Sequence, residues 1–344
     1  MYNKNTMFKR KHILKGVNLG GWLVIEKWIT PSLFINTDSE DEYNLHKSRN
    51  SEIIQNHYDS FITESDFKTL SEYKYNSVRI PIGYWLFGDI PPYPKTVQYL
   101  DRAMEWAQKY SIKVILDLHA LPGSQNGFDH SGRVGDINWH KDSKNIESSL
   151  EVLENISERY KEFDNLFGIE LINEPSIEIP IEILKDYYLR GYEVVRKVCK
   201  PNLAVIFSDS FRPYEWKEFM DNPRFENVYM DIHFYQCFDQ NSKHLSINNT
   251  IKKAKREWVR TIKDVGKYAN IICGEWSMAL NSVYPSEYEN KLVSELIYKY
   301  AKVQRKIFSQ IYGDFFWTYR TKGMNKGAFV WNLSSTLNRD PRNS

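Results

Sequence analysis

Phe167-Gly168-Ile169-Glu170-Leu171-Ile172-Asn173-Glu174-Pro175 is a short apolar run that stops on a carboxylate. The stretch Asn270-Ile271-Ile272-Cys273-Gly274-Glu275-Trp276 has the same form. We interpret each as a buried strand that ends on a glutamate. A carboxylate at the end of a buried strand costs free energy unless chemistry or a partner holds it there. The two stretches therefore predict a fold that brings Glu174 and Glu275 to one site.

Short apolar runs recur along the chain, and longer helical patterns separate most of them. The candidate strands are residues 13–19, 77–80, 114–119, 167–173, 204–208, 228–234, 271–275 and 314–319. Apolar spacings of three and four predict helices over residues 96–110, 146–160, 181–198 and 286–308. Strands that alternate with helices indicate a parallel sheet, and eight of them predict an α/β fold, the (β/α)8 TIM barrel. No glycine-rich turn follows the first strand, which counts against a dinucleotide-binding fold.

No repeat or linker divides the chain, so its 344 residues are expected to form a single catalytic domain. Residues 1–12 are expected to be a polar N-terminal extension, and residues 335–344 a polar C-terminal tail. Hydrophobic residues make up 42% and charged residues 26%, as in ordinary soluble proteins. With 46 basic and 44 acidic residues, the net charge of +2 offers no concentrated basic face, so nucleic acid is not expected as a partner.

The cellular location is predicted from the N-terminus and the cysteines. No apolar segment follows the polar N-terminal residues, so we expect no signal peptide. No stretch approaches the roughly 18 apolar residues of a membrane span. Cys199, Cys237 and Cys273 are odd in number and have no C-x-x-C spacing, which indicates neither a zinc site nor a disulfide framework. We predict a cytoplasmic protein, or a secreted one if a leader has been removed.

Polar and aromatic residues gather at the ends of the candidate strands. They are Arg79, His119, Asn173, Glu174, Asp209, His233, Tyr235, Glu275 and Trp317. Barrel enzymes place their active sites at the C-terminal ends of the strands, so this set predicts a catalytic pocket. Two carboxylates across such a pocket are what hydrolysis of a glycosidic bond requires. The aromatic content of 15% fits either a tyrosine-rich core or a pocket lined for flat sugar faces.

The two glutamates are expected to differ in protonation. Pro175 favours an extended conformation for Glu174, which would fix its carboxyl at the strand tip. As proton donor, Glu174 would need a pKa raised by burial or by the second carboxylate. Glu275 would be ionised, with Arg79 or Tyr235 stabilising its charge.

The alternative is that Glu174 forms an ordinary ion pair with Arg79 at the barrel rim. A carboxyl separation of about 5–5.5 Å would indicate retention, and about 6.5–9.5 Å inversion.

Eight sequence blocks, spread over residues 16 to about 320, occur in the order of one known family. They are Gly16-Val17-Asn18-Leu19-Gly20-Gly21-Trp22-Leu23-Val24, Trp28-Ile29-Thr30-Pro31-Ser32-Leu33-Phe34, Val78-Arg79-Ile80-Pro81-Ile82-Gly83-Tyr84-Trp85, Asp117-Leu118-His119-Ala120-Leu121-Pro122-Gly123-Ser124-Gln125-Asn126-Gly127-Phe128-Asp129, Ile172-Asn173-Glu174-Pro175, His233-Phe234-Tyr235, Gly274-Glu275-Trp276 and Phe316-Trp317. Together they resemble the exo-β-1,3-glucanases of glycoside hydrolase family 5. The resemblance covers most of the chain and is specific for the family, less so for the substrate.

The resemblance implies a retaining double displacement, with Glu174 as acid/base and Glu275 as nucleophile. It implies that Asn173 hydrogen-bonds the sugar 2-hydroxyl, and that Arg79 and Tyr235 orient Glu275. The other implied substrate contacts are Glu26 at the closed end of the pocket, His119, His233 and Trp317 around the cleaved glucose, Phe128 and Phe238 clamping the leaving sugar, and Asp129. No metal and no cofactor are implied, and the histidines lack the H-x-x-x-H and H-E-x-x-H spacings of metal sites.

The implied activity is release of glucose from the non-reducing end of β-1,3-glucans, short β-gluco-oligosaccharides or β-glucosides. Three alternatives stay open: a glucosidase for lipid-linked glucose (glucosylceramide or steryl glucoside), an endo-β-glucanase, and a sugar-binding barrel without catalysis. The chain departs from the family's usual pattern at His130, where asparagine is common, and at Tyr319, where tryptophan is frequent. Both departures bear on the preferred leaving group.

Overall fold

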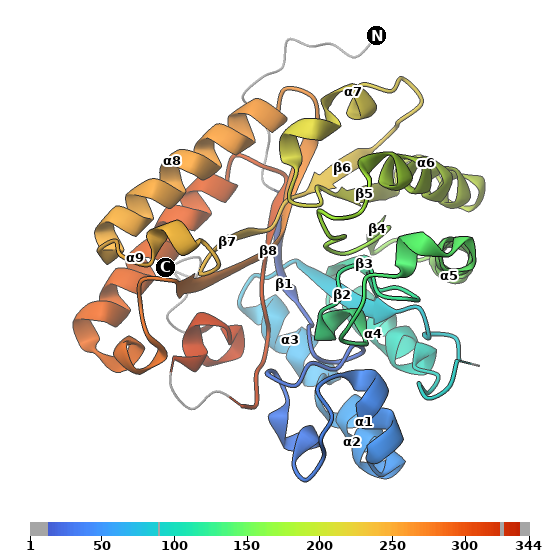
Figure 1. The fold of residues 1–344 in the computed structure, drawn as a ribbon, viewed down its shortest axis with the longest axis horizontal. Coiled ribbons are helices and arrows are strands. Elements are labelled where there is room, and N and C mark those ends of the chain that lie inside the picture. Colours follow the sequence, from blue (N-terminus) through green and yellow to red (C-terminus); the bar gives the residue numbers. More distant parts are fainter. Residues whose placement is uncertain (1–12, 89, 324–326, 338–344) are drawn as a thin grey trace.

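The computed structural model describes residues 13–88, 90–323 and 327–337. In these residues, eight parallel strands form a closed barrel (Figure 1). The barrel strands are β1 (Leu14–Asn18), β2 (Ser77–Gly83), β3 (Lys113–Ala120), β4 (Leu166–Glu170), β5 (Ala204–Ser208), β6 (Val228–Asp231), β8 (Asn270–Leu280) and β9 (Gly313–Phe316). Strand β9 pairs with β1, and β6 pairs with β8, which closes the ring. The predicted (β/α)8 TIM barrel is confirmed.

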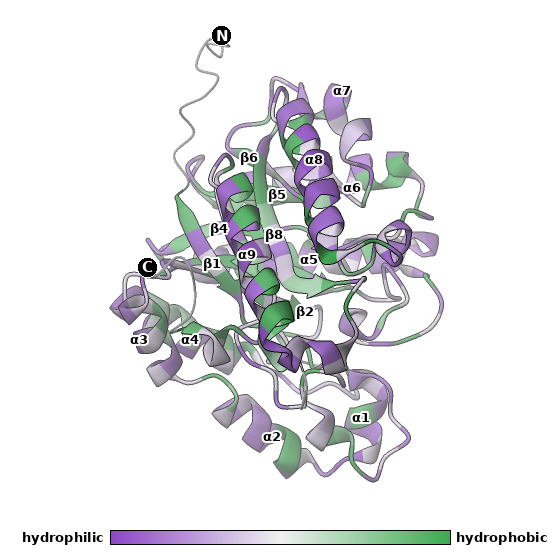
Figure 2. Ribbon diagram, turned by 90° about the vertical axis from the view of Figure 1, so that its left-hand side faces the viewer, coloured by the Kyte–Doolittle hydropathy of each residue, from purple (hydrophilic) through white to green (hydrophobic). Residues whose placement is uncertain are grey.

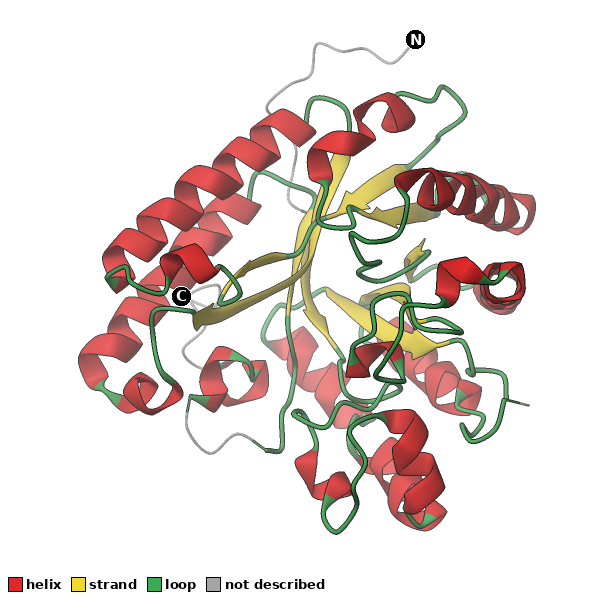
Figure 3. Cartoon of the chain, in the orientation of Figure 1, coloured by secondary structure: helices red, strands yellow, loops and turns green. Residues whose placement is uncertain are grey.

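Nine α-helices lie among the described residues, and Figure 3 shows them packed around the strands. They are α1 (Glu42–Ser48), α2 (Ser51–Ser60), α3 (Glu64–Glu72), α4 (Val97–Lys109), α5 (Ser143–Tyr160), α6 (Ile181–Val198), α7 (Lys217–Met220), α8 (Ile247–Val265) and α9 (Lys291–Phe308). Helices α4, α5, α6 and α9 confirm the four predicted helical patterns. The others were not predicted, although α8 buries an apolar stripe and turns a hydrophilic face outward (Figure 2).

Two strand ends differ from the prediction near the first candidate glutamate. Strand β2 continues to Gly83, so Arg79 lies inside the strand and not at its end. Strand β4 ends at Glu170, which leaves Glu174 in the loop that follows. The glutamate that ends this strand is therefore Glu170, and it faces the barrel interior instead of the pocket.

The second candidate glutamate also lies within a strand and not at its end. Strand β8 continues to Leu280, because the short strand β7 (Phe234–Gln236) pairs with its second half. The predicted strand over 228–234 is divided between β6 and β7. Glu275 therefore lies at the middle of β8, where the barrel meets its rim.

The barrel interior has an apolar layer below a charged one. Buried apolar side chains from six strands pack together in the lower layer: Leu14, Ile115, Ala204, Ile206, Tyr229, Ile272 and Phe315. Successive side chains of a strand point to opposite faces, so residues two positions further on face the same interior. At that next level stand Asp117 and Asp231, both fully buried or nearly so. The charged layer lies at the C-terminal ends of the strands, where barrel enzymes carry their sites.

The predicted N-terminal extension, residues 1–12, and residues 338–344 of the predicted tail lie outside the described residues. At the start of that tail, Thr336 and Leu337 are buried. In the described part of the chain, no helix has both the length and the apolar content to cross a bilayer. All three cysteines are free thiols.

Candidate active site

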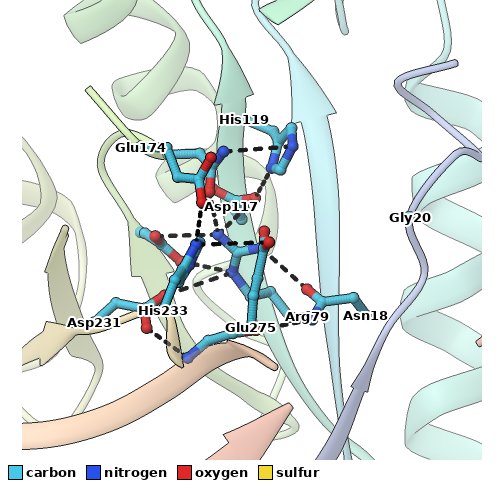
Figure 4. A network of polar contacts seen from close by, with 12 residues as sticks. Asn18, Gly20, Arg79, Asp117, His119, Glu174, Asp231, His233 and Glu275 are labelled. Carbon is cyan, nitrogen blue, oxygen red and sulfur yellow. Dashed lines mark hydrogen bonds and ion pairs between the residues drawn. The ribbon is translucent and has the colours of Figure 1, made fainter. Parts of the chain in front are cut away.

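The charged layer is centred on Arg79, whose side chain is fully buried (Figure 4). Its guanidinium donates to both carboxylate oxygens of Glu170, at 2.8 and 3.1 Å, and to Glu275 Oε1 at 3.0 Å. It also donates to Asn173 Oδ1 at 2.8 Å and to Asn18 Oδ1 at 3.0 Å. Arginine suits this position because its planar fork carries five N–H donors, whereas lysine offers one compact charge.

Two aspartates surround the same cation and connect it to histidines. Asp117 Oδ2 lies 3.1 Å from Arg79 Nη2 and 2.6 Å from His119 Nδ1. Asp231 Oδ2 lies 3.9 Å from Arg79 Nε and 3.3 Å from His233 Nε2. Buried carboxylates of this kind are tolerated only while cations and donors face them. Neither aspartate was predicted as a site residue, because each stands inside an apolar strand.

His233 lies between the two candidate catalytic glutamates. Its Nδ1 is 2.6 Å from Glu174 Oε1 and 3.5 Å from Glu275 Oε2. The Tyr235 hydroxyl donates to the same Glu275 oxygen at 2.8 Å. One carboxylate oxygen from each glutamate and one nitrogen of His233 all lie within 4.8 Å of one another. Arg79 bonds to Glu275 and not to Glu174, so the alternative of a Glu174–Arg79 rim pair is wrong.

The protonation pattern of the two glutamates is the reverse of the one predicted. Burial acts against charge on His233, but Glu275 and Asp231 raise its pKa well above the usual value. Burial likewise acts to raise the pKa of Glu174, yet the hydrogen bond and charge of His233 lower it to about 2. Burial raises the pKa of Glu275 to about 7, and the charge of Glu174 adds to this. The reversal arises because protonated His233 is much closer to Glu174 than to Glu275.

The backbone of Glu174 corrects a second expectation. Its φ is +42°, in the left-handed region, and not the extended conformation predicted from Pro175. Such a φ costs of order 1–3 kcal/mol in a non-glycine residue and persists only where the surroundings hold it. Asn126 Nδ2 donates to the Glu174 carbonyl at 3.1 Å, and Ser210 Oγ donates to the Pro175 carbonyl at 2.8 Å. These contacts hold the loop, and they turn the carboxyl toward His233.

A cavity of about 340 Å³ opens above the charged layer. This volume lies at the lower end of the range for small-molecule sites. Eight predicted site residues line it: Glu26, His119, Asn173, Glu174, Tyr235, Phe238, Glu275 and Trp317. Arg79 and His233 do not line the cavity. They contact the carboxylates that do, Arg79 that of Glu275 and His233 those of Glu174 and Glu275. The cavity is also lined by Trp28, His130 and Trp331, which were not predicted.

Two predicted contacts lie apart from the cavity lining. Phe128 is 59% exposed and stacks on His130, with ring centroids 5.6 Å apart. Asp129 does not line the cavity, but its charge contributes to the raised pKa of Glu26, which does. A signal for His130 existed in the sequence, since it departs from the family's usual asparagine. Trp331 had none, because it follows the last strand and belongs to no recognised block.

Glu26 lines the cavity, and its position is fixed from two sides. Trp28 Nε1 donates to Glu26 Oε2 at 2.7 Å, and Trp331 packs edge-on against Trp28. Below, the buried carboxylate of Glu42 accepts from the Ile25 amide at 2.7 Å. Burial, followed by the charge of Asp129, raises the pKa of Glu26 well above its usual value. A neutral carboxyl can both donate to and accept from hydroxyl groups.

Within the described part of the chain, two groups of acidic and imidazole side chains are close enough to share a metal ion. They are Glu170, Asp231 and His233, and Glu174, His233 and Glu275. Both need His233 as a ligand, but its raised pKa favours the imidazolium, which has no lone pair to give. Arg79 already supplies a positive charge between the carboxylates. The chemistry of the site thus suits a charge network, and the absence of a metal remains a prediction.

Comparison with known proteins agrees with this geometry. The family model "Cellulase (glycosyl hydrolase family 5)" matches residues 37–319. A glucan 1,3-beta-glucosidase of Schwanniomyces occidentalis is 35% identical over 378 aligned residues, covering 94% of this chain and 86% of that protein. A probable glucan 1,3-beta-glucosidase A of Emericella nidulans is 40% identical, covering 78% and 68%. The crystal structure of the rutinosidase from Aspergillus niger shares the fold, with a TM-score of 0.77, 22% identity and coverage of 97% and 99%. The chain is a glycoside hydrolase and belongs to glycosyl hydrolase family 5.

Proposed function

We propose that this enzyme releases glucose from the non-reducing end of β-1,3-glucans and related β-glucosides with retention of configuration. The observation that carries the proposal is the approach of the two glutamates, whose nearest carboxylate oxygens lie within 4.8 Å of each other. So short a gap suits direct attack by one carboxylate on the sugar, whereas inversion needs room for a water molecule. Glu275 is the nucleophile and Glu174 the acid/base.

The active protonation state is one proton transfer away from the resting arrangement. With His233 protonated and Glu174 ionised, the proton lies on a hydrogen bond of 2.6 Å between them. Transfer to Glu174 gives a neutral acid next to the leaving oxygen, while Glu275 stays ionised beside Arg79 and Tyr235. Asp231 accepts from the other nitrogen of His233 and retains the ring in place. Glu174, His233 and Asp231 therefore share their protons as one coupled unit.

The small volume of the cavity and its lining residues support attack at a chain end. Glu26, which accepts a hydrogen bond from Trp28, lines a small cavity together with three tryptophans. One of them, Trp317, stacks on His119 at 5.5 Å. A terminal glucose would present its hydroxyls to Glu26 and a flat face to Trp317. The two relatives named above are glucan 1,3-beta-glucosidases by name, and their sequences align with most of this chain. Asn173, fixed by Arg79, is placed to bind the sugar 2-hydroxyl.

A covalent label tests the assignment of the nucleophile. A 2-fluoro-β-glucoside with a good leaving group should inactivate the enzyme by forming a glycosyl ester on Glu275. Peptide mass spectrometry should find the added mass on the peptide that contains Glu275. A label on Glu174 or Glu26, or NMR showing inversion at the anomeric carbon, would contradict the proposal.

The pH profile should report the proton distribution. Activity requires ionised Glu275, so kcat/KM should rise with pH through an apparent pKa near 7 and fall when His233 and Glu174 lose their shared proton. The Tyr235 hydroxyl lowers the pKa of Glu275, so Tyr235→Phe should move the rising limb to higher pH by about one unit. A limb that stays in place, or moves to lower pH, would show that Tyr235 does not stabilise the ionised nucleophile.

A substrate panel separates the remaining alternatives. Laminari-oligosaccharides should yield glucose as the first product; a mixture of internal fragments would instead indicate an endo-β-glucanase. Faster cleavage of glucosylceramide or a steryl glucoside than of laminaribiose would favour lipid-linked glucose. No turnover of any β-glucoside would indicate a sugar-binding barrel. The cytoplasmic location stays a prediction that fractionation of the source cells would check.

A further inference from the structure

His130 has a place in the cavity that the roles described above do not explain. It belongs to the loop after β3, in a short 3-10 turn over Asp129–Ser131. The loop is closed on itself, since Ser131 Oγ lies 2.7 Å from Ser124 Oγ and donates to the Phe128 carbonyl at 2.6 Å. The ring of His130 therefore stands on a braced segment that projects over the acid/base residue.

Glu174 is flanked by imidazoles on both carboxylate oxygens. His233 Nδ1 faces Oε1 at 2.6 Å, and His130 Nε2 faces Oε2 at 3.6 Å. The two histidines differ in what else they contact, because His233 also lies 3.5 Å from Glu275. No such short contact connects His130 to Glu275 among the described residues, so the ion-pair contact of His130 within the catalytic pair is with the acid/base.

The surroundings of His130 fix which nitrogen carries its proton. Its Nδ1 is buried and has no hydrogen-bond partner in the described part of the chain. A proton on Nδ1 would be a buried, unsatisfied donor, whereas a proton on Nε2 points toward the Glu174 carboxylate. Burial lowers the pKa of His130, which favours the neutral ring. The ring is also packed between Phe128, at 5.6 Å, and His119, at 5.3 Å.

Resting on the proposed function, we propose that His130 is a positioning residue that directs the Glu174 carboxyl toward the glycosidic oxygen and, with Phe128, borders the subsite of the leaving group. Glu174 needs such a second guide because its side chain is 17% exposed and His233 holds only one of its two carboxylate oxygens. A neutral Nε2–H donor orients Oε2 without taking the proton that catalysis uses. Its distance of 3.6 Å shortens to a hydrogen bond when the leaving group fills the subsite.

Leaving-group dependence provides the test. In His130→Ala, kcat/KM for laminaribiose should fall about 10- to 100-fold, because a misdirected acid protonates a poor leaving group badly. For 2,4-dinitrophenyl β-glucoside, whose leaving group needs little protonation, the loss should stay below about threefold. A purely structural role would lower both values equally, and that result would overturn the proposal.

Three further variants complete the design. His130→Asn keeps an N–H donor and should recover much of the laminaribiose activity, whereas His130→Phe keeps the stacking and should behave like His130→Ala. His140→Asn is the matched control, because His140 lies outside the cavity lining, and it should leave both substrates unchanged. Equal recovery by Phe and Asn would refute donation by Nε2. If Glu174→Gln itself retained laminaribiose turnover, the proposed function would fail; intact Glu174 dependence with a silent His130→Ala would refute this inference alone.

Discussion

Glu174→Gln should lower kcat/KM for laminaribiose by about 10²–10⁴-fold, the usual contribution of a general acid. Glutamine keeps the shape of the side chain and a contact with His233, but it has no proton to give to the departing oxygen. The effect should depend on the leaving group. From 2,4-dinitrophenyl β-glucoside the 2,4-dinitrophenolate leaves without needing a proton, so the loss of kcat/KM for that substrate should be smaller. Initial rates on the two substrates under kcat/KM conditions measure this difference.

Glu178→Gln is the matched control for this change. Glu178 belongs to the same loop and is exposed, and its side chain does not line the cavity. The identical substitution there should leave both rates within twofold of the parent, by the usual small effect of exposed substitutions. Laminaribiose turnover in Glu174→Gln at the level of this control would remove Glu174 from the reaction, and with it the proposed mechanism.

The barrel was predictable because its signal is local and repeated. Each buried parallel strand is an apolar run of a few residues, and each of the longer helices carries its own apolar stripe. Helix α8 was missed although Ile251, Ala254 and Trp258 have helical spacing, because its many charges obscured the stripe. The extension of β8 could not be predicted, since it depends on a pairing with β7 across the sheet.

The cavity residues were predictable as a group, but their charges were not. Strand ends and family blocks indicated Glu174, Glu275 and Tyr235 as neighbours. The proton distribution follows from a distance of 2.6 Å between His233 and Glu174, which no sequence pattern contains. The sequence marked His130 only as a departure from the family's usual residue. The role proposed for it follows from the position of its Nε2 opposite Glu174 Oε2.

Arg79→Met should be the most destabilising single substitution in the charged layer. Methionine is of similar length but leaves Glu170, Asp117 and Glu275 buried without their cation. Removing one partner of a buried ion pair costs about 3–5 kcal/mol, because the remaining charges stay desolvated. We expect the Tm to fall by about 5–10 °C, and activity to disappear with the support of Asn173 and Glu275. Thermal unfolding followed by circular dichroism would measure the shift.

The surface pair Arg159–Asp101 is the control, since it has two short contacts, at 2.7 and 2.6 Å, with side chains 44% and 31% exposed. Arg159→Met should cost no more than about 1 kcal/mol. Arg79→Lys retains a charge but loses the fork, so its stability should fall between the two.

The pH dependence of the Arg79→Met effect distinguishes lost charge compensation from lost packing. Burial raises the pKa of Glu170 and of Glu275 above the usual value, and the charge of Arg79 acts against burial in both, so removing Arg79 raises both pKa values further in the folded state. A carboxyl whose folded pKa lies above its unfolded value destabilises the fold at high pH, and this penalty fades as pH falls through the folded pKa. The Tm difference between the parent and Arg79→Met should therefore be larger at pH 8 than at pH 5. A difference that is independent of pH would mean that Arg79 stabilises the barrel by filling space, and that its carboxylate partners are neutral in the parent enzyme.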